Sequence, residues 1–183
     1  TYIRKHVNTT FAGLVKEMES IQQRICQQVR ETVCFQDLQV HCQQLLSQVL
    51  IDSGVLRACS LDLVMKNRFF EPFFPHGLGH LLGIQVHDVG GAQEDRFGKV
   101  PSVNEKVKSL RLLRTLRRHE VVTIEPGLYF IPILLEKYRH AAESKYFNWK
   151  LLNELIQYGG IRIEDNVVVE ADCGINVTRK HLA

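Results

Sequence analysis

The sequence predicts an α+β fold in which helices pack on an antiparallel sheet. Two observations indicate this fold. Apolar residues recur every three or four positions through the first 50 residues, and beyond about residue 70 the chain changes to short β-like runs separated by glycines and prolines. Long helices followed by strands are typical of α+β proteins. With 183 residues, the chain is long enough for one domain with a sizeable core.

Three helices are predicted. The first 30 residues are expected to be largely helical, because their apolar residues fall on one helical stripe: Phe11, Leu14, Val15, Met18, Ile21, Ile25 and Val29. A second helix is predicted over residues 36–52, and Gly54 follows it, where a left-handed residue commonly ends a helix. A short helix is predicted at about residues 148–157, with Asn148 as its N-cap.

Four apolar runs are predicted as strands: residues 84–87, 121–125, 128–131 and 161–169. The polar segment 92–110 is expected to be an exposed loop.

Composition excludes several classes of protein. The hydrophobic content of 45% and charged content of 23% are ordinary for a globular protein, and a net charge of +3 is too small to indicate nucleic-acid binding. No apolar run approaches the roughly 18–20 residues of a membrane span, and no signal peptide is recognised. Five cysteines without CxxC spacing favour a reduced, cytoplasmic chain. Because the sequence starts at Thr1 rather than Met, we expect a longer protein upstream.

Two carboxylates stand in strand-like segments and each has two interpretations. Strand alternation places Arg162 and Glu164 on one face, which is ordinary for a surface sheet. The apolar continuation after Glu164 instead favours burial, and a buried glutamate needs a cation or a metal. Glu125 ends an apolar strand before a proline, so it is either a solvated strand-end residue or a ligand.

Three histidines lie close together in the sequence, at His76, His80 and His87. Each is either a hydrogen-bonded core residue, a metal ligand or a proton carrier. The glycines between them disfavour a regular helix, the absence of a glutamate after His76 excludes the HExxH zinc motif, and glycine allows close backbone approach. One histidine with two glutamates suits Mn²⁺, Co²⁺, Fe²⁺ or Zn²⁺, and two carboxylates able to bridge indicate a two-metal site that activates water.

Several spaced motifs together resemble one family. PHGLGH, VHD, TIEPGLYFI, SKYFNWKLLNEL and YGGIRIEDN occur in the order found in the pita-bread metallopeptidases, and within them are most similar to the bacterial Xaa-Pro dipeptidases (prolidases) and related organophosphorus acid anhydrolases. The resemblance covers essentially the whole chain. It implies a pita-bread (creatinase/aminopeptidase-like) fold, of which residues 1–183 form the C-terminal part of the catalytic domain.

The resemblance also implies residue roles. The metal ligands it implies are His80, Glu125 and a bridging Glu164, for two Mn²⁺ ions, with Co²⁺ or Zn²⁺ as alternatives. His76 and His87 are implied to contact the substrate and transition state, Arg162 to lie beside the bridging glutamate, and Arg111 to bind the carboxylate of the C-terminal proline. In the family a hydroxide bridging the two metals attacks the Xaa-Pro carbonyl, and Glu125 is implied to shuttle protons.

The sequence departs from the family pattern in three places. Two aspartate ligands of the family's five, together with its smaller N-terminal domain, are expected upstream of residue 1. Residues 118–120 replace a Pro-Gly-Met-like turn, and Glu31-Thr32 replaces Pro-Gly before the second helix. If that turn needs a left-handed residue, the replacement costs roughly 1–2 kcal/mol.

The expected function is metal-dependent hydrolysis of Xaa-Pro dipeptides as part of a longer, cytoplasmic enzyme, which binds neither nucleic acid nor membrane and for which a homodimer is the candidate assembly. The 183 residues alone are expected to be inactive. Two alternatives remain open: a truncated, non-catalytic binding module of the same fold, and activity on aminopeptidase P-type peptides or organophosphorus esters.

Overall fold

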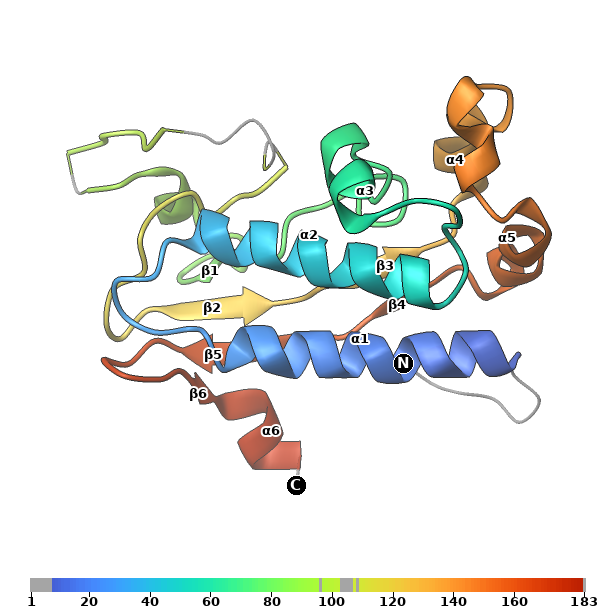
Figure 1. The fold of residues 1–183 in the computed structure, drawn as a ribbon. Coiled ribbons are helices and arrows are strands. Elements are labelled where there is room, and N and C mark those ends of the chain that lie inside the picture. Colours follow the sequence, from blue (N-terminus) through green and yellow to red (C-terminus); the bar gives the residue numbers. More distant parts are fainter. Residues whose placement is uncertain (1–7, 96, 103–106, 108, 183) are drawn as a thin grey trace. The chain divides into compact units, whose positions relative to one another are not determined.

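The computed structural model describes residues 8–95, 97–102, 107 and 109–182 (Figure 1). The chain divides into two compact units. Unit 1 comprises Thr1–Ser20, Gln43–Pro75 and Gly127–Arg162, and unit 2 comprises Ile21–Cys42, His76–Pro126 and Ile163–Ala183. Two helices run through the division: α1, Thr9–Cys26, and α2, Phe35–Asp52. The α+β class expected from the sequence is therefore confirmed.

Unit 2 is built on a four-stranded antiparallel sheet. Its strands follow the order β1-β2-β5-β6, with β1 at Leu81–Leu82, β2 at Val121–Ile124, β5 at Asp165–Val168 and β6 at Ile175–Asn176. A short 3-10 helix, η1 (Val89–Ala92), follows β1, and α6 (Val177–Leu182) follows β6.

Unit 1 contains a two-stranded antiparallel sheet and several short helices. β3 (Gly127–Tyr129) pairs antiparallel with β4 (Gly160–Arg162). The helices are α3 (Leu61–Asn67), α4 (Pro132–Arg139), η3 (Ala142–Tyr146), α5 (Trp149–Leu155) and η4 (Ile156–Tyr158). Stacked and edge-on aromatic rings around Phe147 form the core of this unit, including Phe69, Phe73 and Tyr138.

The helical predictions agree with the structure where it describes them. The predicted stripe on α1 is buried except for the half-buried Val15, and Val29 is buried just beyond the helix. Residues 1–7 of the first predicted helix lie outside the described residues. Asn148 caps α5 by accepting a hydrogen bond from the Leu151 N–H, and Gly54 after α2 is left-handed with φ +73°.

Two strand predictions were wrong. Residues 84–87 form bends rather than a strand, because the chain turns at Gly83, whose N–H donates to the Gln85 carbonyl; the strand is β1, just upstream. Residues 161–169 are not one strand but two, and these pair with different partners: β4 with β3, and β5 with β2. The buried carboxylate here is Asp165, whereas Glu164 is exposed.

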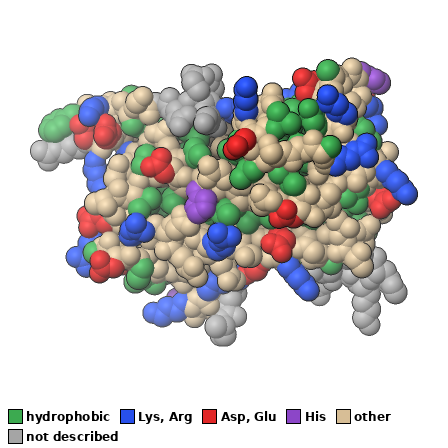
Figure 2. Space-filling model, in the orientation of Figure 1, with side chains coloured by type: hydrophobic (Ala, Val, Ile, Leu, Met, Phe, Trp, Pro, Cys, Tyr) green, Lys and Arg blue, Asp and Glu red, His purple; other side chains and the backbone are tan. Residues whose placement is uncertain are grey.

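Surface features match the bulk composition. On the face drawn in Figure 2, basic and acidic side chains are interspersed rather than gathered by sign. In the basic run 111–119, Leu112 and Leu116 are buried while Arg111 and Arg117 are exposed. Among the described residues, none of the helices combines the length and apolar character that a membrane crossing requires.

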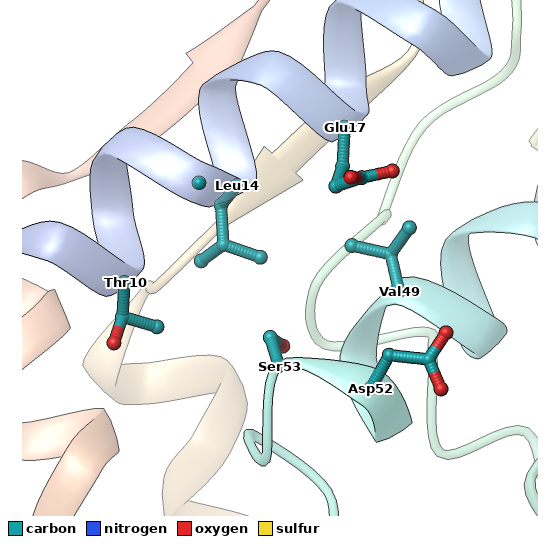
Figure 3. A pocket seen from close by; sticks show the side chains of 7 residues that line it. Thr10, Leu14, Glu17, Val49, Asp52 and Ser53 are labelled. Carbon is teal, nitrogen blue, oxygen red and sulfur yellow. The ribbon is translucent and has the colours of Figure 1, made fainter.

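A cleft of about 320 Å³ opens between α1 and α2 in unit 1. In Figure 3, Leu14 and Val49 face this cleft from the two helices, and the carboxylates of Glu17 and Asp52 lie along one side of it. Gly13 also lines it, and a Cβ built there would meet no atom within 4 Å. None of the motif residues lines this cleft.

Thr32, in the turn before α2, is held in a left-handed conformation with φ +70°. Hydrogen bonds from the Glu31 N–H to Glu170 and from the Thr32 N–H to Leu116 fix the turn. A β-branched residue is strained there by about 1–2 kcal/mol, whereas glycine is not, although glycine loses about 0.5–1 kcal/mol of chain entropy on folding.

Thr32→Gly is therefore expected to stabilise the chain by about 1 kcal/mol, measured by urea unfolding. The converse control is Gly54→Ala: Gly54 has φ +73° and open space around it, so the alanine should cost about 1 kcal/mol through backbone conformation alone. Equal stability of Thr32→Gly and the unchanged chain would show that the turn relaxes without strain.

Because two cysteine thiols are buried, we expect the folded chain to lose stability at alkaline pH. Burial raises the pKa of Cys42 from an ordinary 9.0 to about 12, and burial, followed by the Asp165 carboxylate, raises the pKa of Cys26 to about 12. Since the folded pKa lies above the unfolded one, this stabilisation is complete below pH 9 and is lost as the pH rises towards 12. Urea unfolding across this range should show a shallower decline for Cys42→Ala, and no change in slope for a variant of the exposed Cys173.

Candidate metal centre

The three ligand candidates lie at one end of the unit 2 sheet. His80 precedes β1, Glu125 follows β2 and Glu164 precedes β5. Because neighbouring strands are antiparallel, the start of β1, the end of β2 and the start of β5 coincide. The register pairs Leu81 with Val122 and Ile124 with Asp165, so its continuation sets His80 opposite Thr123 and Glu125 opposite Glu164.

His80 and Glu125 face each other at close range. The His80 Nδ1 lies 3.0 Å from the Leu81 carbonyl oxygen, and since a carbonyl only accepts, Nδ1 carries the proton. The other ring nitrogen, Nε2, lies 3.3 Å from the Glu125 Oε1, with the two side chains only 7% and 12% exposed. A nitrogen lone pair and a carboxylate oxygen are held this close by a proton or a metal ion between them. A histidine that donates its other N–H to a carbonyl is also the usual form of a metal ligand, so the donor set fits a divalent cation.

Thr123 orients this pair and was not identified from the sequence. Its buried hydroxyl accepts a hydrogen bond from the His80 N–H at 3.0 Å and donates to the Glu125 Oε1 at 3.1 Å. Strand alternation places Thr123 and Glu125 on the same face of β2, which is the available sequence signal: a hydroxyl two residues before the carboxylate.

The glycines of the PHGLGH motif permit close backbone packing. A Cβ on Gly79 would lie 1.9 Å from the Thr123 carbonyl oxygen, and one on Gly77 would lie 2.9 Å from the Leu110 Cα. The Leu78 N–H between them donates to the buried Gln39 Oε1 of α2. Gln39 was also missed, because its position on α2 lies among apolar residues and only its polarity marks it.

The other two histidines occupy different surroundings. The His87 ring meets the His80 ring edge-on, with centroids 4.5 Å apart, and His87 is exposed to solvent. His76 is half-buried, and its Nδ1 lies 2.8 Å from the Gly77 carbonyl oxygen. The structure thus brings the His87 ring into contact with the His80 ring of the His80–Glu125 pair.

Glu164 is opposite Glu125 by register but is exposed, so it does not complete a compact ligand cluster. Within the part of the chain that the structure describes, no three histidine, cysteine or carboxylate groups are close enough to hold a metal ion together. Of the two interpretations of Glu164, the structure agrees with the surface position, because alternation along the strand gives the inward position to Asp165.

The three arginines near the motifs differ in environment. Arg111 is exposed, and its backbone carbonyl packs against Gly91. Arg114, which the sequence did not single out, is 10% exposed and pairs with Glu120 at 2.6 Å. In unit 1, the exposed Arg162 donates from Nε to the Tyr129 hydroxyl at 2.6 Å.

Solved structures of aminopeptidase P share this fold. Proline aminopeptidase P II from Yersinia pestis matches with a TM-score of 0.67 and 22% identity, covering 96% of this chain and 33% of that one. Aminopeptidase P from Escherichia coli with the inhibitor Pro-Leu matches with a TM-score of 0.65 and 22% identity, over 94% and 32%. The fold is the pita-bread fold predicted from the motifs.

The chain belongs to metallopeptidase family M24, whose sequence profile matches residues 1–171. The Xaa-Pro dipeptidase of Marinobacter nauticus is 43% identical over 170 residues, which are 93% of this chain and 38% of that protein. The Xaa-Pro dipeptidase of Shewanella woodyi is 40% identical over 169 residues, 92% of this chain and 38% of that protein. The chain therefore spans about two fifths of the length of these relatives.

Proposed function

We propose that the chain is the C-terminal part of the catalytic domain of an enzyme that hydrolyses Xaa-Pro dipeptides with divalent metal ions. The observation that carries the proposal is the His80 Nε2 facing the Glu125 carboxylate at 3.3 Å, with Glu164 next in register. Relatives at 40% and 43% identity are named Xaa-Pro dipeptidases, which supports the substrate class.

His80, Glu125 and Glu164 are the residues that would hold the metal, with Mn²⁺ the proposed ion and Co²⁺ or Zn²⁺ the alternatives. Divalent ions in such a site lower the pKa of water, so that a nucleophile forms at neutral pH. Thr123 keeps the Glu125 carboxylate aimed at His80, and Glu125 can then carry the proton between the water and the leaving amine.

Four further side chains are proposed to act on the substrate. We propose that His87, edge-on to His80 and exposed to solvent, donates to the oxyanion that develops on the scissile carbonyl, and we assign the same role to His76. The exposed Arg111 guanidinium matches the geometry of the dipeptide's terminal carboxylate, and Arg162 is assigned to orient the substrate.

The 183 residues alone are proposed to lack dipeptidase activity. Three donors leave one of two metal ions almost without protein ligands, and the relatives' remaining length is proposed to include the two missing aspartates and the N-terminal domain. The complete enzyme is proposed to act in the cytoplasm.

Gly-Pro hydrolysis in the presence of Mn²⁺ tests the proposal. The 183-residue chain should show negligible turnover, and a longer product of the same reading frame that supplies two upstream aspartates should be active. Turnover by the short chain contradicts the assignment of missing ligands. Assaying an Xaa-Pro-Xaa tripeptide and a phosphotriester beside Gly-Pro separates the dipeptidase from aminopeptidase P-type and anhydrolase activity.

A non-catalytic module of the same fold is the second candidate. It is favoured by the lack, among the described residues, of a cluster of three metal-binding groups. An upstream coding sequence that contains a stop codon, rather than two in-frame aspartates, would decide for this candidate.

A further inference from the structure

Glu164 and Asp165 are adjacent carboxylates that the strand sends to opposite faces. Along β5, burial alternates: Asp165 and Val167 are buried, and Asn166 and Val168 are half-buried. A slip of one residue in the pairing of β5 with β2 would exchange the two carboxylates, because side chains alternate with a period of two. The strand's charge pattern therefore does not by itself decide which carboxylate lies opposite Glu125.

The inward carboxylate is held by two residues near the C-terminus. Asp165 Oδ2 accepts hydrogen bonds from the Arg179 Nε at 2.7 Å and from the Asn176 Nδ2 at 2.8 Å, and the Asp165 side chain is only 2% exposed. Arg179 reaches on to the buried Gln22 Oε1 of α1, at 3.5 Å from its Nη2. A buried carboxylate with a cation and an amide donor is satisfied only in the observed register.

Contacts of Asn176 and Thr178 tie the β6–α6 junction to β5. Asn176 lies on β6 opposite Val167, and the Asn166 N–H donates to the Thr178 Oγ1 at 2.8 Å. The Asn176 Oδ1 accepts from the Arg179 N–H at 3.0 Å, so the β6–α6 junction presents both donors to Asp165 as one rigid unit.

We propose that Arg179 and Asn176 are positioning residues, which hold Asp165 on the inner face and thereby set Glu164 opposite Glu125. This inference rests on the proposed function for the role of Glu164, but the register itself does not require a metal. A slipped strand would bury Glu164 against the junction, leave the Arg179–Asp165 pair broken and present the shorter Asp165 side chain at the end of the sheet.

Cross-strand disulfide formation reports the register without any metal. Glu125→Cys and Glu164→Cys are introduced together in a chain in which the exposed Cys173 is serine. In the native register the two Cα atoms are expected at about 4.5–5.5 Å, which is within the roughly 4.4–6.8 Å that a disulfide spans. The 125–164 cross-link is quantified by mass spectrometry of the digested protein after mild oxidation.

Adding Arg179→Gln should slow formation of this cross-link at least about tenfold, and Arg179→Lys should restore most of it, because a cation near Asp165 is what the register requires. Asn176→Ala, which removes one hydrogen bond and no charge, should give an intermediate rate. The matched control is Arg118→Gln, which breaks the exposed 2.9 Å pair with Glu170 just beyond the other end of β5 and should leave the rate unchanged.

A second readout connects the register to the proposed centre. In the chain with all native carboxylates, Arg179→Gln should weaken Mn²⁺ binding, and Arg179→Lys should recover it. Unchanged cross-linking in Arg179→Gln, with only a lower melting temperature, would overturn the proposal and leave Arg179 a stabilising residue. If the register responds as expected but the longer protein with the two upstream aspartates does not hydrolyse Gly-Pro, the proposed function fails and the positioning role stands. If Arg179→Gln does not fold, the graded response of Asn176→Ala and Arg179→Lys decides.

Discussion

Gly79→Ala should destabilise the chain by about 3 kcal/mol or more, because the new methyl group has no space. Its Cβ would lie 1.9 Å from the Thr123 carbonyl oxygen and 2.8 Å from the Thr123 carbonyl carbon. These are backbone atoms of β2, which pairs with both β1 and β5 and cannot move without breaking the sheet. Any relaxation would push the His80 loop away from Thr123 and so separate His80 from Glu125.

Urea unfolding followed by circular dichroism measures this effect, and Gly13→Ala is the matched control. Gly13 lies inside α1 with no atom within 4 Å of a built Cβ, so alanine there should stabilise the helix by about 1 kcal/mol. The two substitutions are chemically identical and are expected to have opposite signs. A Gly79→Ala protein as stable as the unchanged chain would show that the loop does not pack on Thr123.

His80→Ala should remove most of the Mn²⁺ binding of the 183-residue chain. That chain is expected to bind one ion weakly, through the facing pair His80 and Glu125, and His80 is the nitrogen donor whose tautomer is already set by the Leu81 carbonyl. Loss of a direct ligand should weaken Mn²⁺ binding at least about tenfold. Even residues that only hydrogen-bond to a metal ligand typically change metal affinity by about 10–100-fold when they are replaced. The rise in melting temperature that Mn²⁺ produces should disappear with it.

Electron paramagnetic resonance of free Mn²⁺ measures the binding, with His41→Ala as the control. His41, on α2, belongs to the same unit, but its Nδ1 lies 2.8 Å from the Oε1 of Gln28, in the turn after α1, and neither α2 nor this turn contains a ligand candidate. Its replacement should leave Mn²⁺ binding unchanged. Equal loss in both variants would indicate non-specific binding by histidines, and no loss in His80→Ala would exclude His80 as a ligand.

The two long helices could be predicted from the sequence because they depend on local periodicity. The motifs could be recognised because their residues and their order belong to the chain itself. The apolar stripe from Phe11 to Ile25 recurs at helical spacing whatever the rest of the chain does, and its burial follows. The left-handed conformation of Thr32 could also be anticipated from the sequence, since the family pattern has glycine where this chain has threonine. The family motifs also indicated that His80 and Glu125 belong to one site, and in the structure the His80 Nε2 lies 3.3 Å from the Glu125 Oε1.

Strand limits and burial depended on partners distant in sequence. Residues 161–169 look like one apolar strand, yet β4 and β5 separate at 163–164 because they pair with β3 and β2, which an apolar run cannot reveal. Residues 84–87 have strand-like composition but turn away at Gly83, which leaves Ile84 and Val86 exposed.

By itself, the sequence determined the class of fold, the residue types of the centre and its likeness to metallopeptidases, since helical period and spaced motifs are properties of the chain alone. Only the tertiary structure decided which of two adjacent carboxylates is buried and which nitrogen of His80 is available. Both depend on groups brought in from elsewhere in the chain: Arg179 and Asn176 fix Asp165 on the inner face, and packing on Thr123 fixes the histidine loop. The sequence of a strand is compatible with either register. A partner residue with a definite charge and position stabilises one register over the other.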